Sequence, residues 1–217
     1  YWSPCLNPVG TVKSTLNSAI SAMKFGKDKY DVTLINAFGE CDEHSDFLKK
    51  NNIKIINFNY KLYKYLPKKG FFQSRISYLI IYFVCFIPLL RLIKTLKPDY
   101  FIAHLITSLP LTIMNLSKFN TKFILRISGM PKLNFVRKYF WKFISKKIFI
   151  VTCPSLELKS KLRNMNLFEE SKLQFLPDAI IDMNIFKIQS KEDIHEFQKF
   201  ENKKIIFAAG RLTKQKN

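Results

Sequence analysis

Short runs of β-branched and aromatic residues alternate with longer helical patterns along the chain, and this alternation constrains the fold most. The runs cover residues 30–36, 53–58, 100–104, 122–127, 148–152, 173–176 and 204–209. Helix-length patterns occupy residues 11–25, 72–96, 107–117, 133–145 and 155–165. Several runs are nearly continuous in Ile, Phe, Val and Leu, which is typical of strands buried on both faces of a parallel sheet. The pattern predicts an α/β fold with a Rossmann-like, doubly wound, mainly parallel sheet.

Basic residues outnumber acidic residues by 36 to 16, which gives the 217-residue chain a formal charge of +20. Such an excess predicts an anionic partner, which can be a phosphorylated ligand, an acidic lipid or a nucleic acid. Apolar residues make up 47% of the chain, and this share excludes global disorder. The four cysteines form no CxxC pair and do not cluster with His44, His104 or His195. We therefore expect reduced thiols and no metal site.

Residues 76–90 are fifteen uncharged residues between Arg75 and Arg91. As a helix they would span about 22 Å, at about 1.5 Å per residue. A bilayer core is about 30 Å thick, and Pro88 is expected to interrupt the helix. The preceding residues 61–72 combine four lysines with Tyr and Phe, a mixture that favours an anionic membrane surface. We expect either contact with an anionic membrane or a solvated basic loop followed by a core helix.

The strongest local pattern lies at residues 205–217, where an apolar run ends in Gly210 and Arg211, and Lys216 follows. Glycine permits a tight exit from a strand. An arginine can grip a diphosphate through two oxygens, and a lysine adds a point charge to the same anion. The alternative interpretation is a strand end that carries two solvated cations.

The segment AAGRLTKQKN resembles the GRL-x-x-x-K-N signature that opens the C-terminal domain of GT-B glycosyltransferases, in the large retaining group called family 4 or group 1. Other segments are similar to that family in the same order: WSPCLNPVGT at residues 2–11, YDVTLIN at 30–36, LKPDYFIAH at 96–104 and KLQFLPDA at 172–179. The resemblance covers nearly the whole chain. It implies a Rossmann-like acceptor-side domain at residues 1–182, a linker at 183–203, and the first strand and phosphate-binding loop of a truncated donor domain at 204–217.

The resemblance implies transfer of a sugar from a nucleotide-diphosphate sugar to a glycan or lipid-diphosphate-linked acceptor, with retention of configuration, in bacterial surface polysaccharide synthesis. Gly210, Arg211 and Lys216 would contact the donor diphosphate, so neither a metal nor a cofactor is expected. The implied location is cytoplasmic and peripheral, at the inner face of the cell membrane. Because the chain begins at Tyr1 and lacks the family's paired glutamates, we expect a fragment that is inactive by itself.

On the acceptor side the candidate residues follow predicted strands or the first loop: Gly10, Thr11, His104, Arg126, Ser128 and Gly129. Ligands of doubly wound sheets bind at the carboxyl ends of the strands, so we expect these residues near acceptor or phosphate, with His104 as the candidate catalytic group. The loop that begins at Arg126 lacks the histidine found in many relatives, and the family's first strand is expected to be absent. A capping, packing or loop role is the alternative for each residue.

Two other functions are compatible with the sequence. The charge and the 15% aromatic content permit a basic nucleic-acid-binding module. No recognised nucleic-acid motif occurs, however, so nucleic acid is not expected as a partner. The second possibility is a non-catalytic remnant that packs against a membrane or a partner.

Overall fold

The computed structural model describes residues 1–5, 10–26, 29–58, 60, 71–131, 133–179 and 183–192. The chain divides into two compact units, residues 1–180 and 181–217. The first unit holds the sheet and its helices. In the second, the described part is the helix α7 (Met183–Gln189) and the turn after it. The strand predicted at residues 204–209 lies outside the described residues.

The described strands are all parallel, which confirms the predicted α/β class. β1 (Thr33–Asn36) pairs with β2 (Lys54–Asn57) in a two-stranded sheet. β3 (Tyr100–Ala103), β4 (Lys122–Arg126), β5 (Ile150–Cys153) and β6 (Leu173–Phe175) form a four-stranded sheet in that order. Each lies within the run predicted for it or extends one residue beyond.

Trp2 joins the two sheets. It forms parallel bridges with Ile35 of β1 and with Ala103 of β3. Its N–H donates to the Ile102 carbonyl at 2.8 Å, and its carbonyl accepts from the His104 N–H at 2.9 Å. The spatial order is therefore β2–β1–Trp2–β3–β4–β5–β6. From Trp2 the chain adds β1 and β2 on one side and then β3 to β6 on the other, so Trp2 marks the topological switch point of a Rossmann-like sheet. In the place of the family's first strand, which was expected to be absent, the described residues have only Trp2, as an isolated bridge on each side.

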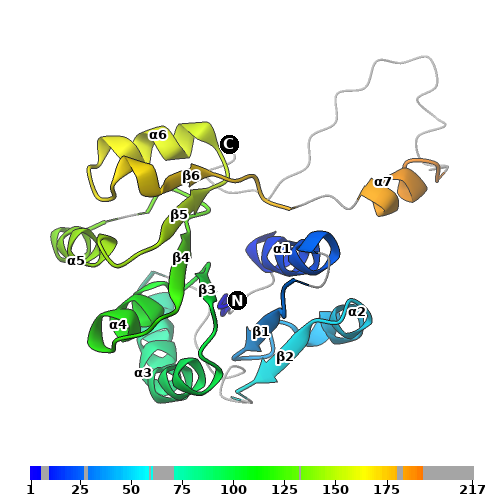
Figure 1. Ribbon diagram of the computed structural model, residues 1–217, viewed down its shortest axis with the longest axis horizontal. Coiled ribbons are helices and arrows are strands. Elements are labelled where there is room, and N and C mark those ends of the chain that lie inside the picture. The colour runs from blue at the N-terminus through cyan, green and yellow to red at the C-terminus, as the bar shows by residue number, and fades with distance from the viewer. Residues whose placement is uncertain are drawn as a thin grey trace. The chain divides into compact units, whose positions relative to one another are not determined.

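Helices cover both faces of this arrangement, as Figure 1 shows. One face carries α1 (Gly10–Gly26) and α2 (Ser45–Lys50), which follows the 3₁₀ turn η1 (Asp42–His44). The other face carries α3 (Phe71–Leu96), α4 (Ser108–Leu116) and α5 (Phe135–Ser145). The helix α6 (Leu156–Asn164) packs against β5 and β6, and the 3₁₀ turn η3 (Glu170–Lys172) leads into β6.

Two helices begin where a side chain caps the first turn. The Asn134 side chain accepts a hydrogen bond from the Arg137 N–H at 2.9 Å, and α5 starts after it. Ser155 accepts from the Leu158 N–H at 3.2 Å at the start of α6. Such caps satisfy amides that lack partners within the helix. The five predicted helices are confirmed to within two residues at each end.

The helix α3 runs through Pro88 without a break, so the predicted interruption is wrong. Proline lacks the N–H that would bond the carbonyl four residues earlier. The Tyr60 hydroxyl donates to that carbonyl, the oxygen of Val84, at 3.1 Å. The orphaned acceptor is thereby satisfied, and the helix can continue.

The two faces of α3 differ in burial but not in polarity. Ser77, Ile81, Cys85, Leu89 and Ile93 recur every four residues and are at most 2% exposed. The apolar members of this row join the main core, which also contains residues of β3, β4 and β5. On the opposite side Ile76, Leu79, Phe83 and Ile87 are exposed. In the part of the chain that the structure describes, residues 75–96 are the one segment long and apolar enough to cross a membrane, by length and composition only.

Candidate functional site

Several sequence-predicted residues gather at the carboxyl edge of the parallel strands. His104 directly follows β3, and Arg126 is the last residue of β4. A third group, Asp178, lies three residues beyond β6. Ser14, in the first turns of α1, donates one hydrogen bond to Asp178 at this edge. The edge therefore combines the switch point, a buried histidine and an ion pair.

The buried Arg126 and the partly buried Asp178 form an ion pair, called here the latch, between β4 and the segment after β6. Arg126 is 4% exposed, and its Nη2 lies 2.5 Å from Asp178 Oδ1. Its Nη1 donates to the Leu176 carbonyl at 2.5 Å. The Ser14 hydroxyl donates to the same Asp178 oxygen at 2.8 Å, which ties α1 into the latch. Both terminal guanidinium nitrogens are thus engaged within the protein, and the predicted acceptor contact of Arg126 stays a prediction.

His104 is buried and unpaired. It is 6% exposed, and neither ring nitrogen has a hydrogen-bond partner among the described residues. The ring lies 6.0 Å from the ring of Tyr1, centroid to centroid. Burial, and next the positive charge of Arg126, lower the pKa of His104 to about 3. The imidazole is therefore neutral near pH 7 and can donate one hydrogen bond and accept another.

The turn after His104 is strained. Ile106 has a φ of 47°, a left-handed conformation that a β-branched residue rarely adopts. Its carbonyl accepts a hydrogen bond from the Trp2 indole at 3.5 Å, and α4 begins two residues later. Strain of this kind costs on the order of 1–3 kcal/mol and concentrates at functional sites. The strained Ile106 and the unpaired His104 both lie just after the carboxyl end of β3.

The other acceptor-side candidates are at or near the surface. Ser128 and Gly129 are exposed in the loop after β4. Gly10 opens α1 and is exposed, while the Thr11 carbonyl accepts from the Thr15 hydroxyl at 2.8 Å. A Cβ at Gly10 or Gly129 would meet no atom within 4 Å, so neither glycine is demanded by packing in the described structure. The donor candidates Gly210, Arg211 and Lys216 lie outside the described residues.

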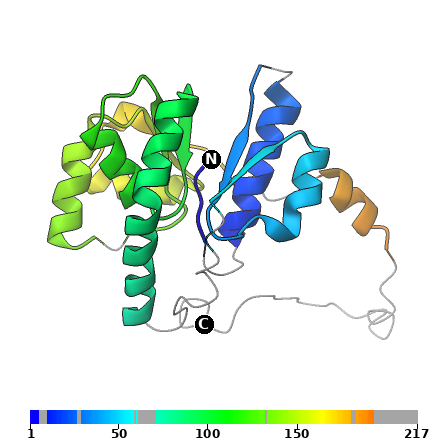
Figure 2. The same ribbon diagram turned by 90° about the horizontal axis from the view of Figure 1, so that it is seen from below.

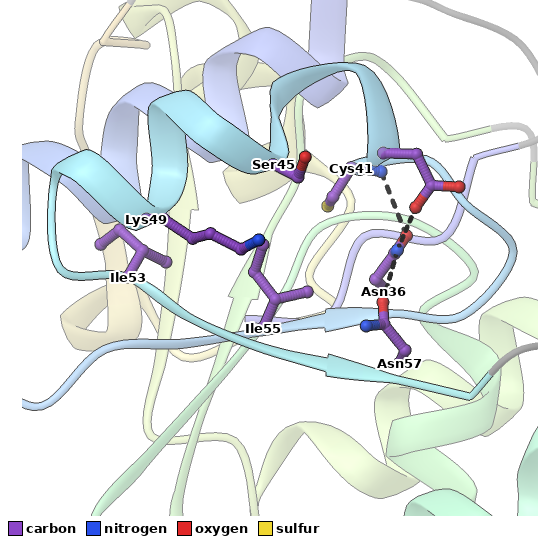
Figure 3. Close-up of a pocket in the computed structure, with 8 residues that line it drawn as sticks. Asn36, Cys41, Ser45, Lys49, Ile53, Ile55 and Asn57 are labelled. Atoms are coloured by element: carbon purple, nitrogen blue, oxygen red, sulfur yellow. Dashed lines mark hydrogen bonds between the residues drawn. The ribbon is translucent and has the colours of Figure 1, made fainter.

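A separate pocket of about 210 Å³ lies between α2 and the two strands β1 and β2 (Figure 3). It is lined by Asn36, Cys41, Asp42, Ser45, Lys49, Ile53, Ile55 and Asn57. Asn36 Nδ2 donates to Asp42 Oδ1 and to Asn57 Oδ1, each at 2.7 Å. Asn36 Oδ1 accepts from the Cys41 N–H at 3.1 Å. The amide of Asn36 is thus used to hold the turn after β1.

The polar groups around this pocket do not form a reactive centre. Burial, and next the charge of Glu40, raise the pKa of Cys41 to about 12, so its thiol stays protonated. The Glu40 carboxylate accepts from the N–H groups of Ala37 and Phe38 at 3.0 and 2.7 Å. Within the described ranges, no three His, Cys, Asp or Glu side chains could together hold a metal ion. The side chains of Asn36 and Glu40 are thus engaged with the turn after β1.

The chain matches no protein-family model and no curated protein. The candidate site therefore stands on the geometry of the carboxyl edge. His104 and Arg126 were predicted from the sequence, whereas Ser14, Ile106 and the pairing of Asp178 were not. No local signal in the sequence connects Asp178 to an arginine 52 residues earlier.

We expect His104→Leu to leave the unfolding free energy at pH 7 unchanged or to raise it by about 1–2 kcal/mol. The reason is that an unpaired buried polar atom costs about 1–3 kcal/mol, and leucine has none. The pKa of His104 in the folded state lies below its ordinary value of 6.5, so the unfolded chain binds an extra proton at this residue between pH 6.5 and pH 3. The unfolding free energy of the wild type therefore has its full value above pH 6.5 and decreases as the pH falls towards 3. Wild type should lose up to about 1.4 kcal/mol per pH unit in that window.

Denaturant unfolding of both proteins between pH 7 and pH 3 measures this effect. The leucine variant should lack that part of the acid sensitivity which the histidine causes. Parallel pH profiles for the two proteins would show that His104 is not held neutral by burial.

Proposed function

We propose that the chain is the N-terminal half of a GT-B glycosyltransferase, together with the start of its donor domain. It would move a sugar from a nucleotide-diphosphate sugar to a glycan or lipid-diphosphate-linked acceptor. The observation that carries the proposal is the unpaired, buried His104 at the switch point beside Trp2. Open α/β sheets bind ligands at this point. The order of the family-like segments along the sequence supports the same proposal.

A neutral imidazole suits a role in orienting a sugar hydroxyl. It can accept the hydroxyl hydrogen at one ring nitrogen while the other nitrogen donates to a second oxygen. A pKa near 3 argues against storage of a proton for general acid catalysis at neutral pH. Because both ring nitrogens are buried, a covering group must move before the ring can touch a substrate. His104 is therefore the proposed acceptor-side contact of the reaction.

The donor side of the proposal rests on Gly210, Arg211 and Lys216. The leaving nucleotide diphosphate gains negative charge as the glycosidic bond breaks. The guanidinium of Arg211 and the ammonium of Lys216, held next to the leaving diphosphate, would stabilise the transition state more than the ground state. The proposed location is cytoplasmic, with residues 61–72 and the apolar α3 in contact with the anionic inner face of the membrane. This proposal involves no nucleic acid.

We expect Gly10→Ala to lower sugar transfer by the intact protein about tenfold without lowering its stability. No described atom lies within 4 Å of a Cβ there, so alanine meets no packing barrier. If the Gly10 amide approaches a phosphate or sugar, the added methyl group obstructs that approach. Transfer rates and thermal melting of the variant measure the two effects separately.

Gly26→Ala is the matched control at the other end of α1. A Cβ at Gly26 would lie 2.4 Å from Cδ2 of Tyr30, so alanine should destabilise the fold. The transfer rate per folded molecule should not change, because Gly26 lies far along the helix from Gly10. Wild-type transfer by Gly10→Ala would remove Gly10 from the proposed site.

A further inference from the structure

The helix α5 carries two exposed rows of opposite character. Phe135, Tyr139 and Phe143 recur every four residues and are all exposed, Phe135 by 84%. Lys138, Lys142 and Lys146 recur at the same spacing and are also exposed. Each lysine is three positions from an aromatic residue, so the rows are neighbours on the helix surface. Val136, 73% exposed, widens the apolar row.

The opposite side of α5 anchors it to the protein. Trp141 and Ile144 are at most 2% exposed and belong to the main core. The Arg137 guanidinium lies 5.0 Å from the centroid of the Trp141 ring and covers it. The rows of Phe135 and Lys138 are thus held outward by a fixed helix. In monomeric soluble proteins, apolar surface of this extent commonly marks an interaction site.

The exposed side of α3 carries a second apolar row on the same face of the sheet. Figures 1 and 2 show α3 and α5 in the same layer of helices, on the face opposite α1 and α2. Three residues separate the end of α3 from β3, and eight residues separate the end of β4 from α5. Since each helix runs antiparallel to its strands, both N-terminal halves lie towards the carboxyl edge. We name the exposed residues Ile76, Leu79 and Phe83 of α3, together with both rows of α5, the outer face.

The part of the sequence that contains α3 and α5 is strongly basic. Residues 47–156 hold twenty basic residues and a single acidic one, Asp99. Neither α3 nor α5 contains an acidic residue. An aromatic row beside a lysine row, without carboxylates, matches the aromatic and basic composition of helices that lie in the headgroup region of anionic membranes.

We propose that the outer face is a membrane-docking surface, on which α5 lies flat against anionic phospholipid. An eleven-residue helix is about 16 Å long, which is too short to span a bilayer. This inference refines the peripheral membrane contact proposed above. It is tested by lipid binding rather than by sugar transfer, so either claim can fail while the other stands.

A second copy of the chain fits this surface poorly. Two outer faces would meet lysine row against lysine row, and the chain as a whole carries +20. Nucleic acid would satisfy the lysines but would leave Phe135, Tyr139 and Phe143 without an apolar environment. An anionic lipid surface satisfies both rows, because phosphates lie directly above the acyl chains.

Co-sedimentation with vesicles tests the proposal. The purified chain should bind vesicles of 30% phosphatidylglycerol in phosphatidylcholine and should bind pure phosphatidylcholine only weakly. Lys138→Gln with Lys142→Gln should lower the partition coefficient on anionic vesicles about 30-fold, since each lysine contributes about 1 kcal/mol. Tyr139→Ser with Phe143→Ser should lower it about tenfold or more on the same vesicles.

Lys24→Gln with Phe25→Ser is the matched control, because it removes an exposed cation and an exposed aromatic ring from α1 on the opposite face. It should bind as wild type does. An environment-sensitive fluorophore on Val136→Cys should shift to the blue on anionic vesicles, and one on Phe25→Cys should not. If the α5 variants bind vesicles as well as the control does, the proposal is overturned. Binding of the same variants to duplex DNA is measured in parallel, and variants that lose DNA binding but keep vesicle binding would also overturn it.

Discussion

Arg126→Met is expected to lower the unfolding free energy by about 3–5 kcal/mol, the usual cost of removing one partner from a buried ion pair. The guanidinium bonds Asp178 Oδ1 and the Leu176 carbonyl, both at 2.5 Å. Without it, the Asp178 carboxylate keeps only the Ser14 hydroxyl among its described partners. Denaturant titration of the purified chain measures the loss.

Asp178→Asn in the Arg126→Met background should recover part of the lost stability, because it removes the stranded charge. Arg163→Met is the matched control. Arg163 pairs with Glu170 at 2.7 Å, but its side chain is 49% exposed. Its loss should cost less than about 1 kcal/mol. Equal costs for Arg126→Met and Arg163→Met would refute the latch.

Arg211→Ala is expected to lower the turnover of the intact protein by a factor on the order of 100 to 1000, and to weaken donor binding less. This expectation rests on the proposed donor role. The leaving diphosphate carries more charge in the transition state than in the bound donor, so loss of one preorganised cation costs about 3–4 kcal/mol of barrier. Lys216→Ala should show a similar defect. Steady-state kinetics at saturating donor measures turnover directly.

Two further variants sharpen this prediction. Arg211→Lys should restore turnover only in part, since an ammonium lacks the two-pronged geometry of a guanidinium. Lys214→Ala removes a cation of the same loop that the signature does not require, and turnover should stay within about twofold of wild type. Unchanged turnover of Arg211→Ala at saturating donor would contradict the assigned role.

The described strands and the five longer helices were predictable because local patterns determine them, whereas the short helices α2 and α7 were not predicted. Buried parallel strands such as β4 and β5 appear as continuous apolar runs, and capping residues such as Ser155 mark helix starts. Two features escaped prediction because their causes lie far apart in the sequence. The carbonyl freed by Pro88 is satisfied by Tyr60. Trp2 completes the sheet through bonds to β1 and β3, without an apolar run of its own.

The candidate site was predictable in position but not in its interactions. The rule that ligands of parallel sheets bind at carboxyl ends pointed to His104 and Arg126. The sequence could not tell which of them has a partner. The structure separates the two: Arg126 is engaged by Asp178, and the His104 ring is unpaired among the described residues. Arg126 is therefore assigned to the latch, and His104 is the candidate contact for substrate.

Transfer of labelled sugar by the intact protein tests the central claim most directly. The assay presents a panel of radiolabelled nucleoside-diphosphate sugars with a bacterial membrane-lipid extract and counts label in the lipid and glycan fractions. We predict transfer from at least one donor, and a loss of about 100-fold or more in a folded His104→Leu variant, because the sugar hydroxyl loses its orienting partner. Transfer from no donor in the panel, or wild-type transfer by His104→Leu, would contradict the claim.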